Sequence, residues 1–253
     1  MGEAKREGKI LAVDIGGSGL KAALIDRTGA MLTERLRVKT PRPSPPPALL
    51  RALQTLVRPL LPGPALIGVS VGFPGVVRDG RVITAPNLGT DEWRGFDLAR
   101  ALAKLWKKPV RVVNDADMQG LGAARGRGIE MVITLGTGFG SAILVDGRLG
   151  PHLEISQHPF RKGETYDQQL GNAARKKIGN KKWSRRVASA FVTLRTLVNF
   201  DALYVGGGNA RHVEVELPTG VHLVANDCGM RGGAALWGDA RSAASASPRP
   251  RRR

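Results

Sequence analysis

The chain of 253 residues (27.0 kDa) is long enough to bury one large core or two smaller ones, and 42% hydrophobic residues are typical of a globular protein. Its 39 Lys and Arg against 21 Asp and Glu give a net charge of +18, which indicates a polyanionic partner: nucleic acid, an anionic membrane or an inorganic polyanion. The single cysteine, Cys228, excludes an intrachain disulfide framework and a cysteine-rich zinc site, which fits a reducing compartment.

The first nine residues, MGEAKREGK, contain no apolar stretch and do not form a signal peptide. Arg6 stands where an N-myristoylation signal needs Ser or Thr. No run of about 18 apolar residues occurs in the chain, so we expect no segment to span a membrane. These features predict a cytoplasmic protein.

Residues 10–26 (ILAVDIGGSGLKAALID) contain two apolar runs around a glycine-rich turn, the pattern of a β-hairpin. Three glycines allow the turn to approach a bulky anion, and its N–H groups, Ser18 and Lys21 can hold phosphate oxygens. Asp14, at the end of the first strand, can hold a magnesium ion or its water shell. The alternative is an ordinary hairpin, since neither the Walker spacing nor GxGxxG is present.

The rest of the first half alternates strands and helices. Residues 31–39 predict a third strand, and the proline-rich residues 41–47 predict a stiff connector rather than a peptide-docking motif. Further predicted elements are helices over 48–60, 97–107 and 116–127, strands over 66–71 and 110–113, and a small hairpin over 76–86.

The second half begins by repeating the first. Residues 131–135 and 141–145 predict two strands around the glycine-rich turn 136–140. This repeat suggests two duplicated lobes, each offering backbone N–H groups to a phosphate chain between them. Later predictions are a mostly helical segment over 161–195, strands over 202–205 and 221–224, a helix over 231–237 and disorder from residue 242.

Seven segments, spread in order over residues 10–238, resemble the motifs of the ROK sugar kinases of the actin-like, ribonuclease-H-like ATPase superfamily, and within that family the polyphosphate glucokinases. They are DIGGSGLK (14–21), GFPG (72–75), PNLG (86–89) followed by Trp93, VNDAD (113–117), LGTGFGSA (135–142), HLEISQHPF (152–160) and VGGGNA (205–210).

The resemblance implies an α/β protein with the two-lobed actin-like ATPase (ribonuclease-H-like) fold and an active site in the interlobe cleft. We expect an N-terminal α/β lobe over residues 1–117 and a C-terminal α/β lobe over 118–240, whose last helix can pack back on the first lobe. A disordered basic tail is expected over 241–253.

In the resembling kinases, the position of Asp115 is the base that accepts the proton of the sugar hydroxyl, and Asn114 holds another hydroxyl. Taken without the resemblance, Asp115 also fits an N-cap for the next helix, and Asp117 is expected in the first turn of that helix rather than as a second base. The implied phosphate-binding residues are Gly16, Gly17, Ser18, Lys21, Thr137 and Gly138, with Asp14 holding Mg²⁺ directly or through water; the implied nucleotide-binding residues are Gly206, Gly207 and Gly208.

The implied sugar-binding residues are Asn87, Asn114, Glu154, Gln157, His158 and Asp167. The chain departs here from the family pattern Glu-x-Gly-His, because Glu154 is followed by Gln157, which cannot carry a positive charge. His158 is the alternative, although a lone histidine is usually structural. Trp93 is expected in the core rather than in the site.

The identity of the phosphoryl donor depends on the basic residues. Residues 161–195 carry ten Lys and Arg against Glu164 and Asp167, which suits a long polyphosphate; the alternative is a set of solvated helix faces. The zinc-binding cysteine cluster and the N-terminal helix-turn-helix of other ROK proteins are absent, so we expect no structural zinc and no transcription regulator.

The sequence therefore predicts a magnesium-dependent kinase that phosphorylates glucose at its 6-hydroxyl, and also mannose, from inorganic polyphosphate and ATP. The alternatives are an ATP-dependent ROK hexokinase of other sugar specificity and a non-catalytic basic nucleic-acid-binding protein on the same fold. An aromatic content of 5% argues against nucleic acid. The sequence leaves a homodimer open.

Overall fold

The computed structural model describes residues 8–61, 66–89, 91–225 and 227–238. Two five-stranded sheets form its framework. The strands of the first are β1 (Lys9–Ile15), β2 (Gly19–Ile25), β3 (Leu36–Lys39), β4 (Leu66–Phe73) and β7 (Val110–Asn114). Those of the second are β8 (Ile129–Leu135), β9 (Phe139–Val145), β10 (Arg148–Leu149), β13 (Ala202–Gly206) and β14 (Val221–Leu223).

The two sheets have the same topology. Their strand orders are β3-β2-β1-β4-β7 and β10-β9-β8-β13-β14. In each sheet, the three strands that come first in the sequence form an antiparallel meander. The other two strands then add in parallel to the first strand of that meander and to each other. The repeat predicted from the two glycine-rich turns is thus confirmed, because β1–β2 and β8–β9 occupy equivalent places.

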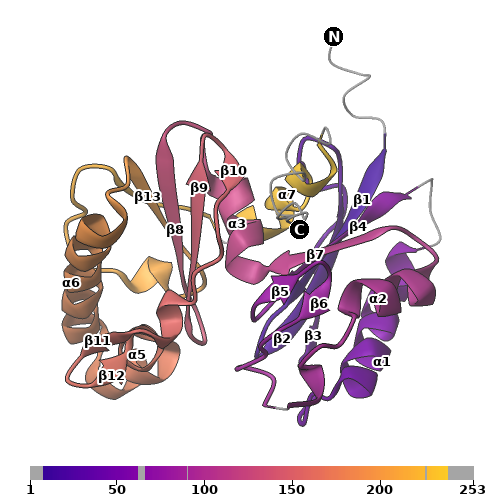
Figure 1. Cartoon of the computed structure of the whole chain (residues 1–253), viewed down its shortest axis with the longest axis horizontal. Coiled ribbons are helices and arrows are strands. Elements are labelled where there is room, and N and C mark those ends of the chain that lie inside the picture. The colour runs from indigo at the N-terminus through magenta and orange to yellow at the C-terminus, as the bar shows by residue number, and fades with distance from the viewer. Residues whose placement is uncertain (1–7, 62–65, 90, 226, 239–253) are drawn as a thin grey trace, which may run out of the picture.

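Helices cover both faces of each sheet, as Figure 1 shows. They are α1 (Pro46–Val57), α2 (Leu98–Trp106), α3 (Asp115–Ala123), α4 (Tyr166–Leu170), α5 (Asn172–Ile178), α6 (Asn180–Val198) and α7 (Cys228–Gly232). Small hairpins β5 (Val77–Arg78)–β6 (Arg81–Val82) and β11 (Pro159–Arg161)–β12 (Glu164–Thr165) complete the two lobes.

The core follows these layers. Leucines of α1 and α2 pack with Val13 and Val71 on the outer face of the first sheet, and Trp183 and Phe191 of α6 pack on the outer face of the second. On the inner faces, Met230 of α7 lies against the first sheet, while α3 lies against the second. Each such buried side chain contributes roughly 1.5–3 kcal/mol of hydrophobic stabilisation.

Helices α3 and α7 cross between the lobes (Figure 1). Their backbones approach so closely that a Cβ atom on Gly122 would collide with the Cys228 carbonyl oxygen, and one on Gly232 would collide with the Met118 carbonyl oxygen. The glycines therefore permit a helix crossing that joins the two sheets.

Two predicted boundaries are wrong for local reasons. The third strand is limited to Leu36–Lys39, because the Thr33 hydroxyl accepts the Leu24 N–H (3.0 Å) and replaces a ladder carbonyl. Helix α3 ends at Ala123 rather than at residue 127, since the buried Glu130 carboxylate accepts the next three N–H groups, at residues 125–127. The predicted tail over 241–253 lies outside the described residues.

Candidate active site in the cleft between the two sheets

A cleft of about 890 Å³ opens between the two sheets, a size typical of small-molecule sites. The loops that follow β1, β7, β8 and β13 all reach it. Every residue predicted for catalysis or binding lines this cleft except His158 and Gly206. The structure thus brings together residues that are far apart in the sequence.

The loop between β1 and β2 forms one wall. Thr40 Oγ1 donates to the Gly16 carbonyl (2.6 Å) and Arg42 Nη2 donates to the Gly17 carbonyl (2.6 Å). Within the described residues, the N–H groups of Gly17 and Ser18 have no intramolecular acceptor. Free N–H groups on a braced glycine loop are a suitable cradle for phosphate oxygens.

The loop between β8 and β9 forms the facing wall in the same way. The Asn172 N–H (3.1 Å) and Asn209 Nδ2 (2.9 Å) both donate to the Gly136 carbonyl. Across the described ranges, the N–H groups of Thr137 and Gly138 likewise lack an intramolecular acceptor. The two halves of the repeat therefore present equivalent loops.

The two loops meet directly. Ser18 Oγ and Thr137 Oγ1 are 3.1 Å apart. Directly after the second loop, the Phe139 N–H donates to Asp167 Oδ1 (2.8 Å), and a Cβ on Gly138 would collide with the same carboxylate. Asp167, predicted as a sugar ligand, thus uses one oxygen to support the second phosphate loop.

Asp14 ends β1 beside the first loop. Its Oδ2 accepts from Lys21 Nζ at 2.7 Å, because the antiparallel register of β1 and β2 places the two residues opposite each other. Both side chains are partly buried. The pair offers one carboxylate and one ammonium group to a phosphate–metal complex.

Asp115 lies at the junction of β7 and α3, facing Asp14. Burial and the negative charge of Asp14 raise the pKa of Asp115 to about 7. The Ala116 N–H, which donates to Asp115 Oδ1 at 2.9 Å, lowers this pKa, while Asp117 and Glu154 raise it further. A carboxylate with a pKa near neutrality is well suited to general base catalysis.

Asn114, not Asp115, is the N-cap of α3. Its Oδ1 accepts from the Ala116 N–H (2.8 Å) and the Asp117 N–H (3.3 Å), and its Nδ2 donates to the Gly75 carbonyl (3.1 Å). The alternative prediction of a capping role for Asp115 is therefore wrong. The cap fixes the start of the helix, so Asp115 is directed into the cleft from a rigid position.

His152 is the residue that the sequence reasoning missed. Its Nδ1 is 3.1 Å from Asp117 Oδ2, and its Nε2 is 2.7 Å from Glu154 Oε1. Burial lowers the pKa of His152, but the hydrogen bonds and charges of Asp117 and Glu154 raise it to about 10. The site therefore contains a histidine that is protonated at neutral pH, two residues before the predicted Glu154.

The remaining predicted sugar residues divide into two groups. Asn87 and Gln157 line the cleft; Asn87 packs beside Gly17, and Gln157 Nε2 donates to Ser156 Oγ (3.2 Å). His158 does not line the cleft, and its Nδ1 is 2.8 Å from the Pro159 carbonyl. Of the two positions predicted after Glu154, only Gln157 therefore lines the cleft, and the histidine that contacts Glu154 is His152.

The glycine run after β13 lies at the rim of the cleft. Gly207 has φ of +86° and packs against the Leu135 backbone, where a Cβ would collide, and nothing lies within 4 Å of a Cβ on Gly208. Gly206 is buried behind them, against Gln119. The Gln119 amide nitrogen has no hydrogen-bond partner among the described residues, and the side chain lines the cleft.

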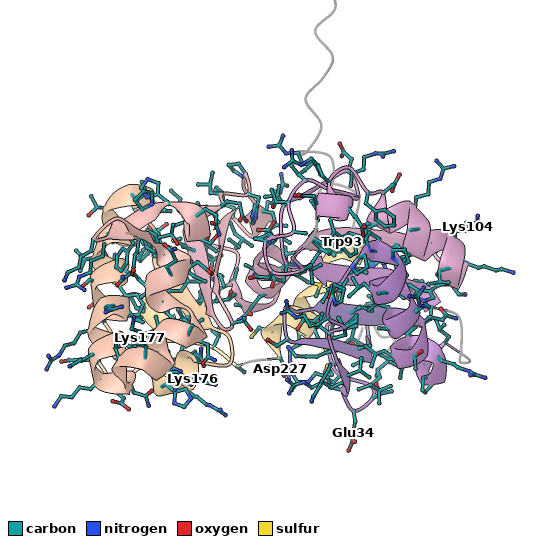
Figure 2. All side chains as sticks on the ribbon, turned by 90° about the horizontal axis from the view of Figure 1, so that it is seen from below. Glu34, Trp93, Lys104, Lys176, Lys177 and Asp227 are labelled. Carbon is teal, nitrogen blue, oxygen red and sulfur yellow. The ribbon has the colours of Figure 1, made fainter. Side chains whose placement is uncertain are left out.

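The basic residues of the cleft differ from those expected. Lys21, Arg35, Arg37 and Arg211 line it. None of the ten Lys and Arg between residues 161 and 195 does, including Lys176 and Lys177, labelled in the second lobe in Figure 2. The basic helical segment is therefore not part of the cleft wall.

The carboxylates of the cleft suit a magnesium ion rather than a metal cage. Mg²⁺ is usually held by one or two carboxylates together with substrate phosphates, and Asp14 lies next to the two phosphate loops. Over the described ranges, no group of three or more His, Cys, Asp or Glu side chains forms a metal cluster.

The helices of the described residues are all too short or too polar to cross a membrane.

Comparisons with known proteins agree with this geometry. Residues 10–151 match the model of the ROK family. The polyphosphate glucokinase of Mycobacterium tuberculosis strain H37Rv is 30% identical over 217 residues, covering 81% of this chain and 80% of the relative. That of Mycobacterium leprae is 30% identical over 216 residues; the chain spans 65% of its length.

Solved structures extend the match over the whole fold. The inorganic polyphosphate/ATP-glucomannokinase from Arthrobacter sp. strain KM superposes with a TM-score of 0.82 at 31% identity, covering 91% of this chain and 98% of that one. A ROK family glucokinase from Streptomyces griseus superposes with a TM-score of 0.74 at 22% identity, covering 90% and 99%. The predicted two-lobed actin-like ATPase fold is confirmed, and the chain belongs to the ROK family.

Proposed function

We propose that this protein is a kinase that transfers a phosphoryl group from inorganic polyphosphate, and from ATP, to the 6-hydroxyl of glucose. The observation that carries the proposal is the position of Asp115. This carboxylate lies in the cleft close to Asp14, on the same cavity as both glycine loops, and its pKa is raised to about 7. Phosphoryl transfer needs this combination of an oriented base and phosphate-binding groups.

In the proposed step, the sugar oxygen attacks the terminal phosphorus of the donor while its proton passes to the Asp115 carboxylate. The bond between that phosphorus and the bridging oxygen breaks, and the leaving group is a polyphosphate one unit shorter, or ADP. Free N–H groups at Gly17 and Ser18 on one side, and at Thr137 and Gly138 on the other, bind the phosphate oxygens.

A bound magnesium ion would neutralise charge on the donor phosphates. Asp14 is the residue proposed to hold it, directly or through water, beside Lys21. The zinc-independence predicted from the lone Cys228 stays a prediction.

The sugar side of the cleft is proposed to include Asn87, Asn114, Glu154 and Gln157. His152 is added to this set. Held between Asp117 and Glu154, it fixes the Glu154 carboxylate, so that Oε2, which accepts from Ser156 Oγ (3.3 Å), can also accept from a sugar hydroxyl. His158 is not retained, because it does not line the cleft.

The choice of donor and acceptor is supported by the relatives. The two mycobacterial proteins are polyphosphate glucokinases, and the Arthrobacter protein is a polyphosphate/ATP-glucomannokinase, which supports mannose as a second acceptor. An ATP-dependent hexokinase of other sugar specificity is the second candidate, supported by the Gly207–Gly208 rim where nucleotides are expected. Lobe boundaries near residue 117, a homodimer and a cytoplasmic location stay predictions.

The test is phosphorylation of glucose and mannose by the purified protein with Mg²⁺ and either long-chain polyphosphate or ATP, followed by ³¹P NMR. We expect glucose 6-phosphate from both donors. Phosphorylation of neither glucose nor mannose, with ATP-dependent phosphorylation of another sugar, would favour the second candidate. Release of free phosphate without sugar phosphate, or no reaction with either donor, would contradict the proposal.

A further inference from the structure

The net charge of +18 raises the question of which Lys and Arg side chains contact a polyanionic donor. The sequence points to residues 161–195, but that segment contributes no basic residue to the cleft. Two of its arginines make other contacts: Arg175 donates to Asn172 and Asn180, and Arg195 donates to the Thr219 carbonyl. The cleft cations come mainly from the first lobe.

Strand β3 and the residue directly before it supply two of them, Arg37 and Arg35. In its register with β2, Arg37 lies opposite Lys21, and Lys39 opposite Gly19. Side chains alternate along a strand, so Leu36 and Val38 pack against the core while Arg35 and Arg37 occupy the other face. We call Arg35 and Arg37 the β3 arginine strip.

The strip begins at the first phosphate loop. The Arg37 Nε lies 3.2 Å from the position that a Cβ on Gly19 would occupy, directly after the loop. Arg35 lies directly before β3, two residues before Arg37 and so farther from the loop in the β2–β3 register. Both line the cleft, so the strip leads outward from the phosphate-binding loop along the first lobe.

Among the described residues, no carboxylate forms an ion pair with the β3 arginine strip. Arg35 and Arg37 are exposed, and neither makes an ion pair within the described part of the chain. The neighbouring Glu34 points away from the body of the molecule in Figure 2. By contrast, Lys21, the remaining cation of this wall, is already paired with Asp14. Two unpaired guanidinium groups beside a phosphate loop are suited to binding further phosphates.

Resting on the proposed function, we propose that the β3 arginine strip binds the phosphates of a polyphosphate chain beyond the one being transferred. A nucleoside triphosphate ends in its adenosine, which the glycine rim of the second lobe is expected to receive, on the side of the cleft opposite β3. A linear polyphosphate has no nucleoside and continues past the loop. The strip therefore distinguishes a long inorganic donor from ATP.

The test replaces both arginines, as Arg35→Gln/Arg37→Gln, and measures KM for long-chain polyphosphate, tripolyphosphate and ATP. We expect KM for long-chain polyphosphate to rise about tenfold, with a shallower salt dependence, and the KM values for tripolyphosphate and ATP to rise much less. The matched control is Lys182→Gln/Arg185→Gln, which removes two exposed charges from α6, outside the cleft. Circular dichroism checks the fold of both variants.

Equal increases in KM for all three donors would overturn the proposal, because the strip would then bind only the transferred end. An equal effect in the α6 control would also overturn it, since net charge alone would be responsible. Direct binding of long-chain polyphosphate, measured without sugar by calorimetry, separates this proposal from the function. If the wild type binds polyphosphate through the strip but phosphorylates no sugar, the proposed function fails and the binding site remains.

Discussion

The hydroxyl oxygens of Ser18 and Thr137 lie 3.1 Å apart, although the two residues are on loops of different sheets. Each follows the first strand of one copy of the repeat, on a loop whose carbonyls are held by neighbouring side chains or backbone N–H groups. A phosphate oxygen placed between the loops can replace the hydrogen bond between the two hydroxyls. We therefore propose that the repeat produces one phosphate site with a loop on each side.

The brace on the first loop can be tested with Thr40→Val. This change removes the hydrogen bond from the buried Thr40 hydroxyl to the Gly16 carbonyl. We expect the free energy of unfolding to fall by about 1 kcal/mol and KM for the donor to rise about fivefold. Thr33→Val is the control, because its hydrogen bond to Leu24 lies outside the cleft. A similar increase in KM for both variants would show that the Thr40 hydrogen bond to the Gly16 carbonyl has no specific effect on donor binding.

The second loop offers a comparison of two glycines. A Cβ on Gly138 would collide with the Asp167 carboxylate, whereas nothing lies within 4 Å of a Cβ on Gly136. We expect Gly138→Ala to lower the free energy of unfolding by about 1–3 kcal/mol, and Gly136→Ala to change it by less than about 0.5 kcal/mol. Denaturant unfolding measures both values. Equal stabilities would show that Asp167 does not support the loop.

The charge of His152 predicts an NMR result. Its pKa is raised to about 10, above the ordinary value of 6.5, so the ring is protonated in the folded protein from pH 5.5 to 8.5. We expect its imidazole resonance, assigned by comparison with His152→Gln, to stay constant over this range. A titration with a midpoint near 6.5 would show that the two carboxylates do not hold the proton.

Removing the same histidine should destabilise the protein. His152→Gln leaves Asp117 and Glu154 without their shared cation in a largely buried place, and we expect a loss of about 3 kcal/mol at pH 7. The control is His158→Gln, whose exposed ring lies outside the cleft with its Nδ1 near the next carbonyl; we expect a change within about 0.5 kcal/mol. A small effect in both variants would contradict the role of His152.

Asp115 predicts a pH-dependent trade-off between stability and function. Because its pKa is raised from 3.8 to about 7, the folded state keeps a proton that the unfolded state loses in this range, so the fold loses stability as the pH rises from 3.8 to about 7 and stays at the lower level above pH 7. Asp115→Asn removes this cost. We expect the gain in Tm over the wild type to be larger at pH 8 than at pH 5. A gain that is the same at both pH values would show an ordinary pKa for Asp115.

Much of this architecture was predictable from the sequence. Glycine-rich turns between apolar runs identified both hairpins, and the family motifs identified Asp115 and the cleft walls. The prediction succeeded there because turn chemistry and strand patterns are local signals. The lobes face each other across the cleft, so pairs such as Ser18 and Thr137 became visible only in the structure.

The errors involve long-range contacts. His152 stands beside the quoted Glu154, and its importance depends on Asp117, which belongs to another element. The signal that could have indicated His152 was a titratable histidine two residues before the predicted sugar-binding residue Glu154. Likewise, the Lys and Arg side chains of 161–195 lie outside the cleft, while Arg35 and Arg37, at and directly before a short strand, line it. The number of charges in a segment does not show which surface a side chain faces.

The most direct test of the account is the rate of glucose phosphorylation by the wild type and Asp115→Asn, with Mg²⁺ and polyphosphate, as a function of pH. We expect kcat/KM of the wild type to rise with pH through a midpoint near 7, as Asp115 ionises. The activity of the variant should be about 10²–10⁴-fold lower, and it should no longer depend on pH near 7. The variant should still bind glucose. A variant that keeps wild-type activity, with the same pH profile, would contradict the assignment of Asp115 as the base.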